Sequence, residues 1–313
     1  MRYNTYSEAL VKRFGEKVYK IPVNLPLSCP NRDGTCGKGG CTFCGEVGTG
    51  FENLKPEIAI AKQLEANIAY IGPKYKAKKF NAYFNNFTNT FCSVEDLETQ
   101  LKEACISGVV GLCISTRPDC ISEAQLDVMS KIQKEYGVEI TIELGLQTVN
   151  YHTLQKLNRG HGLAEFVDAV LRIKPRGFRI CGHLIGNLPW DEDLDLREAS
   201  KLLSVLGISE VKIHTLYILK NTALAKQYMA GAFEMGTVES YVNRVVDFIR
   251  HASPEMVFQR FAGRAPEEET IFCNWGMSWW KVKDLIDERL ELLDAHQGDL
   301  CHYLNGPSLR KFV

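Results

Sequence analysis

The sequence predicts an α/β protein in which helices cover a parallel sheet. The 313 residues are 45% hydrophobic and 24% charged, a composition that is typical of a globular chain and excludes collagen-like, disordered and coiled-coil classes. Past residue 55, short runs rich in β-branched and aromatic residues alternate with amphipathic stretches. Repeated strand–helix units joined by short loops require parallel strands, because each helix carries the chain back across the sheet.

Six strand–helix units follow one another along the chain. Residues 109–115 (VVGLCIS) form the continuous apolar run of a buried strand, and Ser93 is a helix cap before an amphipathic stretch. Six units are two short of a closed (β/α)8 barrel, and periodicity cannot separate a partial barrel from a doubly wound sheet. The predicted strands cover residues 17–24, 79–86, 109–115, 138–146, 177–185 and 210–217. The predicted helices cover residues 93–104, 122–135, 150–157, 163–173, 192–206, 222–230 and 237–251.

The remainder of the chain adds little to this core. A strand at 256–261 and a helix at 281–294 are expected to form a C-terminal addition. No run approaches the roughly 18 apolar residues of a membrane helix, and the charged first twenty residues contain no secretory signal, so a cytoplasmic location is expected. A net charge of −1 provides no general field for nucleic acid. Any RNA contact would need a local patch, and the only concentrated positive charge is Lys74, Lys76, Lys78 and Lys79.

The cysteines are the most informative residues. Four of the eleven, Cys29, Cys36, Cys41 and Cys44, fall in one glycine-rich segment directly after the first predicted strand. That position is the carboxyl end of the strand, where α/β folds place their active sites. In a reducing compartment, clustered cysteines indicate metal or redox chemistry more often than disulfides.

Three kinds of site are compatible with this segment. A zinc knuckle would use all four cysteines, although the spacing from Cys29 to Cys36 is not a usual zinc pair. A plant-type ferredoxin loop would use Cys36, Cys41 and Cys44 with a fourth cysteine from elsewhere. A third possibility is an iron–sulfur cluster held by Cys29, Cys41 and Cys44, which leaves one iron open to bind a ligand.

The third arrangement resembles the radical S-adenosylmethionine (SAM) superfamily, which has an aromatic residue, here Phe43, between the last two cysteines. The spacing of eleven and then two residues is similar to that of the branch related to the Elongator catalytic subunit, and the whole chain resembles the YhcC/YtqA family. The segments that carry the resemblance are CPNRDGTCGKGGCTFC (29–44), YFNNFTNT (83–90), STRPDC (115–120), ELGLQT (143–148), LNRGH (157–161), HLIGNLP (183–189) and IHTLYILKNT (213–222).

The resemblance implies a fold, two cofactors and a chemistry. Residues 1–252 would form a partial (β/α)6 TIM-type barrel, and residues 253–313 a small α/β extension packed on it. A [4Fe–4S] cluster would sit on Cys29, Cys41 and Cys44, with Cys36 as a spectator. SAM would chelate the fourth iron, and its reductive cleavage would give a 5′-deoxyadenosyl radical that abstracts hydrogen from the substrate.

The resemblance also implies contacts to SAM. Asn85 and Asn86 occupy the place where many relatives have a Gly-Gly-Glu motif for the SAM amino group, so an amide or backbone carbonyl would replace the carboxylate here. Gln147 would lie near the ribose and Arg159 near the carboxylate of SAM. Glu143, inside an apolar strand, is expected to point into a polar cavity and to meet a partner there.

Further polar residues follow the predicted strands. Arg117, His183 and His214 could bind substrate or be satisfied structural groups, and Asp119 could cap the next helix. No P-loop, dinucleotide fingerprint or Ser-His-Asp spacing stands out, so hydrolase, NTPase and dehydrogenase classes receive little support.

The resemblance suggests tRNA as the substrate. Relatives in the Elongator branch act on the wobble uridine, which predicts a step at its C5 side chain such as conversion of carboxymethylaminomethyl to aminomethyl. An electron donor such as flavodoxin or ferredoxin would be required, and a partner modification enzyme could take part. Two alternatives are a radical SAM enzyme acting on a small molecule or peptide, and an iron–sulfur electron-transfer protein that does not use SAM.

Overall fold

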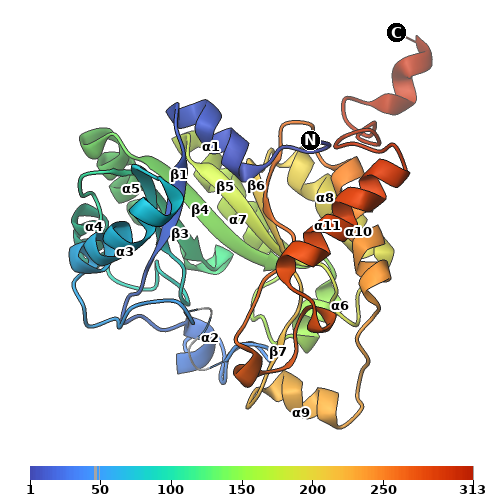
Figure 1. Cartoon of the computed structure of the whole chain (residues 1–313), viewed down its shortest axis with the longest axis horizontal. Coiled ribbons are helices and arrows are strands. Elements are labelled where there is room, and N and C mark those ends of the chain that lie inside the picture. The colour runs from blue at the N-terminus through green and yellow to red at the C-terminus, as the bar shows by residue number, and fades with distance from the viewer. Residues whose placement is uncertain (46–47, 49, 313) are drawn as a thin grey trace.

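The computed structural model describes residues 1–45, 48 and 50–312, and its centre is one curled sheet of seven parallel strands (Figure 1). The strands lie side by side in the order β1-β2-β3-β4-β5-β6-β8, and every neighbouring pair is parallel. Their bounds are β1 Val18–Val23, β2 Lys79–Phe84, β3 Val109–Thr116, β4 Glu139–Gln147, β5 Arg179–Ile185, β6 Glu210–His214 and β8 Val257–Arg260. The carboxyl ends of the strands therefore share one edge, which lies toward α2, β7 and α9 in Figure 1.

Helices cover the convex face of the sheet, and their ends follow capping signals in the sequence. Ser122 caps α5 in a capping box with Gln125, and Gly137 ends that helix in the left-handed conformation. The helices are α1 Tyr6–Phe14, α2 Pro30–Asp33, α3 Ile60–Tyr75, α4 Val94–Glu103, α5 Glu123–Tyr136, α6 Tyr151–Lys156, α7 Leu163–Ile173, α8 Asp193–Val205, α9 Ala223–Met229, α10 Val238–His251 and α11 Trp279–Leu292.

Strand β4 shows how the two faces of the sheet differ. Ile140, Ile142 and Leu144 belong to the main apolar core, whereas Glu143 makes ionic contacts to residues of β1 and β6. Alternate side chains of a strand point to opposite faces. The apolar core therefore lies between the sheet and the outer helices, and the concave face forms a polar lumen.

The expected partial barrel is confirmed, and the doubly wound alternative is wrong because the sheet curls around a lumen. Residues 256–261 were expected in a C-terminal addition, but β8 continues the main sheet beside β6. The sequence analysis also did not identify α1, α3 or the antiparallel pair of β7 (Ile218–Leu219) and β9 (Thr270–Phe272). The boundary at residue 252 between the barrel and the C-terminal extension stays a proposal. None of the helices in the described ranges is both long and apolar enough to cross a membrane.

The N-terminal segment lies against residues from the far end of the chain. Asn4 Nδ2 donates to the carbonyl of Pro254 at 2.6 Å, and the backbone N–H of Gln297 donates to the carbonyl of Arg2 at 2.8 Å. Thr5 also forms a parallel bridge with Phe258 of β8. These contacts hold α1 across the amino-terminal edge of the strands, opposite the edge that carries the cysteines.

Candidate functional site

The cysteine segment leaves β1 at the carboxyl edge of the sheet and folds back on itself. Cys41 is buried, Cys29 and Cys44 are half-buried, and Cys36 is exposed. The backbone N–H of Cys44 donates to the carbonyl of Cys41 at 3.0 Å, which closes a tight turn between these two residues. Gly40 has φ +77°, and a Cβ there would lie 3.0 Å from Cγ of Arg32, so glycine suits this position both in conformation and in space.

The turn between α6 and α7 supports this segment from beneath. Asn158 Nδ2 donates to the carbonyl of Gly40 at 2.8 Å, and the carbonyl of Asn158 accepts from Asn31 Nδ2 at 2.6 Å. The backbone N–H of Thr42 donates to the carbonyl of Leu157 at 3.0 Å. The segments 29–44 and 157–161, which are far apart in sequence, thus form one structural unit.

Arg159 is the centre of this unit. Its Nη1 donates to Sγ of Cys41 at 3.2 Å, and its Nη2 donates to the carbonyl of Gly145 at 2.8 Å. Nη2 also lies 2.8 Å from Nε2 of His161, which must accept because the guanidinium can only donate. Burial, then the cations Arg159 and Arg117, lower the pKa of His161 to about 3, so this imidazole is neutral.

Gln147 ends β4 in an unusual conformation next to Arg159. Its φ is +75°, in the left-handed region, and the pairing of β4 with β5 is irregular between Gly145 and Gln147. A Cβ on Gly145 would lie 3.0 Å from Nε2 of Gln147 and 3.1 Å from Nη2 of Arg159. Gln147 and Arg159, the two predicted SAM contacts, therefore meet above Gly145. Backbone strain such as that at Gln147 occurs more often at functional sites than elsewhere.

Asn85 and Asn86 follow β2 at the same edge. Asn85 Oδ1 accepts from Asn53 Nδ2 at 2.7 Å, and Asn86 Nδ2 donates to Asn24 Oδ1 at 3.2 Å. Oδ1 of Asn86 is buried and has no hydrogen-bond partner in the described part of the chain. An unpaired buried acceptor is costly, so it offers a place for a donor such as an ammonium group.

Phe43 lies between the last two cysteines and is half-buried. It packs against a second, smaller apolar cluster at this edge rather than against the main core. Its backbone is part of the turn between Cys41 and Cys44. This packing fixes the position of the turn.

The donor set fits an iron–sulfur cluster. Burial raises the pKa of Cys44 to about 11, and the nearby thiols of Cys41 and Cys29 raise it further. Besides Arg159, Asn31 Nδ2 points at Sγ of Cys41 at 3.6 Å. N–H donors aimed at cysteine sulfur are a recurrent feature around iron–sulfur clusters, where they tune the potential.

A separate group of polar side chains fills the lumen beside this site. Glu143 on β4 makes ion pairs with Lys20 on β1 and Lys212 on β6, and its Oε2 lies 2.8 Å from Nε2 of His183 on β5. Burial alone would raise the pKa of Glu143, but the two lysines hold it well below its usual range. The expectation that Glu143 meets partners is confirmed by these contacts, whereas its proposed place in the SAM site stays a prediction. Both of its oxygens are engaged within the chain.

Glu143, His183 and Cys181 could in principle hold a metal ion, because one ligand atom of each lies within 4.8 Å of the others. The two ammonium groups that already bind the carboxylate of Glu143 oppose a dication at this position. We therefore regard this group as an ionic network and not as a metal site.

The other predicted polar residues divide between the two regions. Arg117 donates to both oxygens of Asp119 at 2.9 and 2.6 Å and to the carbonyl of Arg159 at 2.8 Å. The expectation that Asp119 caps the next helix is wrong, because Ser122 is the cap and Asp119 binds Arg117 instead. His214 ends β6, and its ring centroid lies 5.6 Å from that of His183 in the lumen.

Sequence reasoning missed Lys20, Lys212 and Arg260. They lie on three different strands, β1, β6 and β8, and only the sheet brings them together. Lys20 and Lys212 each interrupt an apolar alternation (VYKIPV and EVKIH), which is the same signal that singled out Glu143. A charge on an inward-facing strand position could therefore have identified both lysines, whereas their common partner could not have been predicted.

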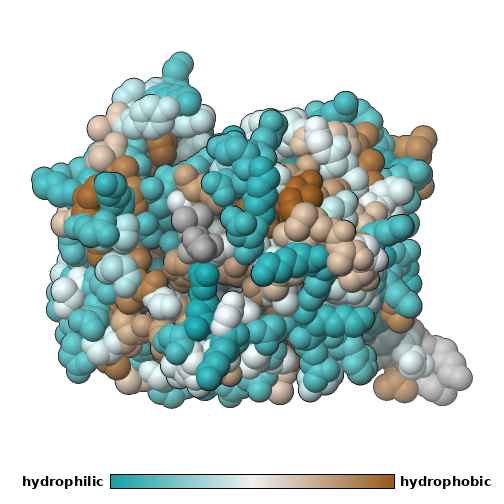
Figure 2. Space-filling model, turned by 90° about the horizontal axis from the view of Figure 1, so that it is seen from below, coloured by the Kyte–Doolittle hydropathy of each residue, from teal (hydrophilic) through white to brown (hydrophobic). Residues whose placement is uncertain are grey.

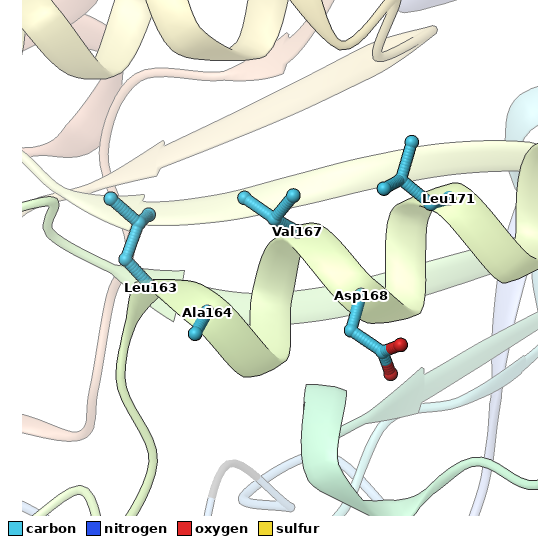
Figure 3. A pocket seen from close by; sticks show the side chains of 5 residues that line it. All are labelled: Leu163, Ala164, Val167, Asp168 and Leu171. Atoms are coloured by element: carbon cyan, nitrogen blue, oxygen red, sulfur yellow. The ribbon is translucent and has the colours of Figure 1, made fainter.

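Two surface features lie outside this region. The predicted basic patch (Lys74, Lys76, Lys78 and Lys79) ends at Lys79, the first residue of β2, which binds Glu16 at 3.1 Å. At about 3.3 Å per residue, the six residues of β2 separate this end from the carboxyl edge by about 20 Å. Figure 3 shows a pocket on α7 lined by Leu163, Ala164, Val167, Asp168 and Leu171, which offer no set of groups to hold a cofactor.

Figure 2 views the carboxyl edge of the sheet from below and shows a largely hydrophilic face with apolar residues between. The cysteine segment and the ends of the strands contribute to this face.

Comparisons with known proteins agree with this geometry. A family model described as the Radical_SAM C-terminal domain matches residues 208–292. The uncharacterized protein YtqA of Bacillus subtilis is 35% identical over 309 residues, which are 98% of this chain and 95% of that protein. YhcC of Escherichia coli is 35% identical over 290 residues, 92% of each chain.

More distant matches extend the comparison. The tRNA uridine(34) acetyltransferase of Methanocaldococcus infernus is 24% identical over 168 residues, which are 53% of this chain and 30% of that protein. Among solved structures, the archaeal Elp3 of Methanocaldococcus infernus superposes with a TM-score of 0.67 at 17% identity, covering 90% of this chain and 64% of that one. This structural likeness shows a shared fold.

Proposed function

Because this chain belongs to the YhcC/YtqA family of the radical SAM superfamily, we propose that it modifies the C5 side chain of the tRNA wobble uridine. The chain is a radical SAM enzyme, and its cofactors are a [4Fe–4S] cluster and SAM. When bound, the reduced cluster would supply one electron to the sulfonium of SAM, and the cleavage would give methionine and the radical that removes a hydrogen atom from the substrate.

The residues of the chain have distinct proposed parts. Cys29, Cys41 and Cys44 bind the cluster, and Arg159 donates to the sulfur of Cys41 while it orients the carboxylate of SAM. Gln147, held over Gly145, contacts the ribose. The free Oδ1 of Asn86 accepts from the amino group of SAM, and Asn85 positions the strand end through Asn53.

The observation that carries the tRNA proposal is the similarity to the uridine(34) acetyltransferases, which align over 53% of this chain. The Elp3 structure shares the fold over 90% of this chain. Hydrogen abstraction at the glycine-derived carbon of a carboxymethylaminomethyl group is the step we propose, on the way to aminomethyl. A flavodoxin or ferredoxin would serve as the electron donor, and a partner modification enzyme could deliver the tRNA.

The position of the lysines argues against the basic patch as the binding surface for the anticodon. Lys74, Lys76, Lys78 and Lys79 lie at or before the amino end of β2, at the edge opposite the cysteines. An anticodon loop bound there would not reach the radical site. The proposed RNA surface is the face around the carboxyl ends of the strands, shown in Figure 2.

The test is 5′-deoxyadenosine formation by the anaerobically reconstituted, reduced protein. Two tRNA pools are compared, one from cells that lack the gene and one from normal cells. The proposal predicts release stimulated only by the first pool, together with loss of the carboxymethylaminomethyl nucleoside by mass spectrometry. The Cys41→Ala variant should release none, and Cys92→Ala, a substitution away from the cluster segment, should act like the wild type.

Release that does not depend on tRNA would overturn the tRNA substrate while leaving a radical SAM enzyme that acts on a small molecule or peptide. Absence of SAM binding by protein with an intact cluster would instead favour an electron-transfer role. These outcomes separate the three functions that the sequence left open.

A further inference from the structure

The lumen carries one layer of polar side chains contributed by successive strands. Lys20 from β1, Tyr83 from β2, Ser115 from β3, Glu143 from β4, His183 from β5 and Lys212 from β6 all take part in it. Lys212 Nζ donates to Oη of Tyr83 at 2.8 Å, and Lys20 Nζ donates to Oε1 of Gln259 at 2.9 Å. The layer is therefore tied together across the whole width of the sheet.

The charges of this layer do not balance. Glu143 is the only carboxylate, within the described residues, that makes an ion pair with Lys20 or Lys212. A third cation, Arg260 of β8, extends the layer, and its Nη2 lies 3.1 Å from Nδ1 of His214. Lys20 and Lys212 therefore share one carboxylate, and Arg260, which is exposed, makes no ion pair within the described residues.

The histidines do not change this balance. Burial, followed by Lys212, lowers the pKa of His183 to about 4. Burial, followed by Arg260, lowers the pKa of His214 well below its usual value. Both imidazoles are neutral at physiological pH, so the layer retains two unbalanced positive charges.

The next layer of side chains, toward the amino ends of the strands, has balanced charges. Arg13 contacts Glu139 at 2.5 Å and Glu210 at 3.4 Å, and Arg179 contacts Glu210 at 2.7 Å. Two arginines and two carboxylates neutralise each other there. The surplus of positive charge is thus confined to the layer nearer the cysteines.

The surplus cations also have unused donors. In the described part of the chain, the ammonium groups of Lys20 and Lys212 each make two hydrogen bonds, and an ammonium has three N–H groups. Among the described residues, Arg260 hydrogen-bonds to the ring of His214, and because Arg260 is exposed, its other guanidinium N–H groups are accessible to a ligand. Lys212 is 4% exposed, so its remaining N–H lies where water competes poorly.

The layer lies next to the cysteine segment through Tyr217 and Leu219. Leu219 packs beside Gly45, which follows Cys44, because a Cβ on Gly45 would lie 2.6 Å from Cδ1 of Leu219, and Tyr217 lies two residues before it in the chain. Gly263 leaves room beside this tyrosine, because a Cβ there would lie 3.2 Å from Nδ1 of His214 and 3.6 Å from Cε1 of Tyr217.

We propose that Lys212 and Arg260 form an anion subsite that binds the carboxylate of the substrate side chain and holds the adjacent methylene toward the cluster. This inference rests on the proposed function, since the carboxymethylaminomethyl group carries a carboxylate one bond from the carbon that loses hydrogen. Glu143 binds Lys20 through one oxygen and Lys212 through the other, so a substrate carboxylate would use the remaining N–H of Lys212. A substrate carboxylate would bring the charge of the layer closer to balance.

The test uses reconstituted full-length protein and two synthetic anticodon stem-loops. One carries carboxymethylaminomethyl uridine, and the other carries the corresponding primary amide, which has the same shape without the charge. Binding is measured without reductant, and 5′-deoxyadenosine formation is measured with it. Charge-assisted hydrogen bonds contribute enough that the wild type should bind the acid about tenfold to a hundredfold more tightly than the amide.

Arg260→Met should abolish this discrimination, and Arg260→Lys should restore part of it. Lys212→Met should also abolish the discrimination between acid and amide, but it removes an ion-pair partner of Glu143. Arg260→Met is therefore the cleaner test, because it leaves the buried pair of Lys212 and Glu143 intact. Arg289→Met is the matched control, because Arg289 pairs with Glu239 on the outer surface. The iron content and the affinity for SAM of each variant show whether the site is still assembled.

Equal binding of acid and amide by the wild type, or unchanged discrimination in Arg260→Met, would overturn the subsite. Binding that discriminates without any radical formation would overturn the proposed function and leave the subsite standing. The binding and turnover measurements therefore fail independently.

Discussion

Arg159 donates a hydrogen bond to the sulfur of Cys41 at 3.2 Å, although the two residues are separated by 118 positions in the sequence. The same guanidinium reaches the carbonyl of Gly145 at the irregular end of β4. One side chain thus connects the cysteine segment, the turn after α6 and the central strand. The position of the proposed cluster is fixed relative to the sheet by this connection.

Replacing Arg159 should change the redox behaviour of the cluster. A cation next to the cluster stabilises its reduced, more negative state, so Arg159→Met should move the reduction potential to a more negative value. Loss of a charge-assisted hydrogen bond of about 1.5–3 kcal/mol corresponds to roughly 60–130 mV for a one-electron couple. The measurement is an anaerobic redox titration followed by electron paramagnetic resonance. Arg172→Met, on the outer surface of α7, should leave the potential unchanged.

Single cysteine substitutions should divide into two groups. Cys29→Ala, Cys41→Ala and Cys44→Ala should each lose the [4Fe–4S] cluster, because each removes one of three protein ligands. Cys36→Ala should retain it, since Cys36 is exposed at the outside of the segment. Iron and sulfide content per chain and the Mössbauer spectrum report the result. Equal loss in Cys36→Ala and Cys29→Ala would contradict the three-cysteine site.

Glu143→Gln should strongly destabilise the fold. The substitution leaves Lys20 and Lys212 buried near each other without a counter-charge, which costs about 3–5 kcal/mol in comparable buried pairs. Thermal unfolding under anaerobic conditions measures the change. Glu98→Gln is the control, because Glu98 pairs with Lys102 and Lys131 at the surface, where such pairs contribute less than about 1 kcal/mol. A loss in Glu143→Gln no larger than the control would contradict this account of the lumen.

Stability should fall as the pH is lowered. The pKa of His183 is about 4 in the folded chain against 6.5 for an ordinary histidine, so the unfolded chain binds a proton first. The stabilising contribution is complete above pH 6.5 and is lost as the pH falls toward 4. At about 1.4 kcal/mol per pKa unit the loss is on the order of 3 kcal/mol. Urea unfolding between these pH values should be less pH-dependent in His183→Gln than in the wild type, whereas the exposed His296→Gln should retain the full dependence.

Most of the fold could be predicted because its signals are local. The continuous apolar run of β3 and the cap Ser93 of α4 lie within a few residues of the structure that they specify. Helix α3 was missed because Gly72 and Pro73 weaken the helical pattern of its last turn. Strand β8 was placed in an addition because α9 and α10 separate it from β6 in the sequence, and only the tertiary fold shows that they are neighbours.

Part of the candidate site could be predicted from local sequence signals, and part could not. The cysteine spacing and the LNRGH segment were visible in the sequence, and Asn158 and Arg159 do contact the cysteine segment. The cationic layer was not visible, because Lys20 and Lys212 are 192 positions apart and meet only through Glu143. Networks across a lumen depend on strand order and register, which single-sequence patterns do not determine.

The contacts of the N-terminal segment with Pro254 and Gln297 have a consequence for biosynthesis. Residues 2–5 contact Pro254, Phe258 and Gln297, so this end of the barrel cannot close until residue 297 has left the ribosome. Until then, α1 lacks its contacts with β8. Nascent chains halted before residue 254 should therefore be targets for chaperones.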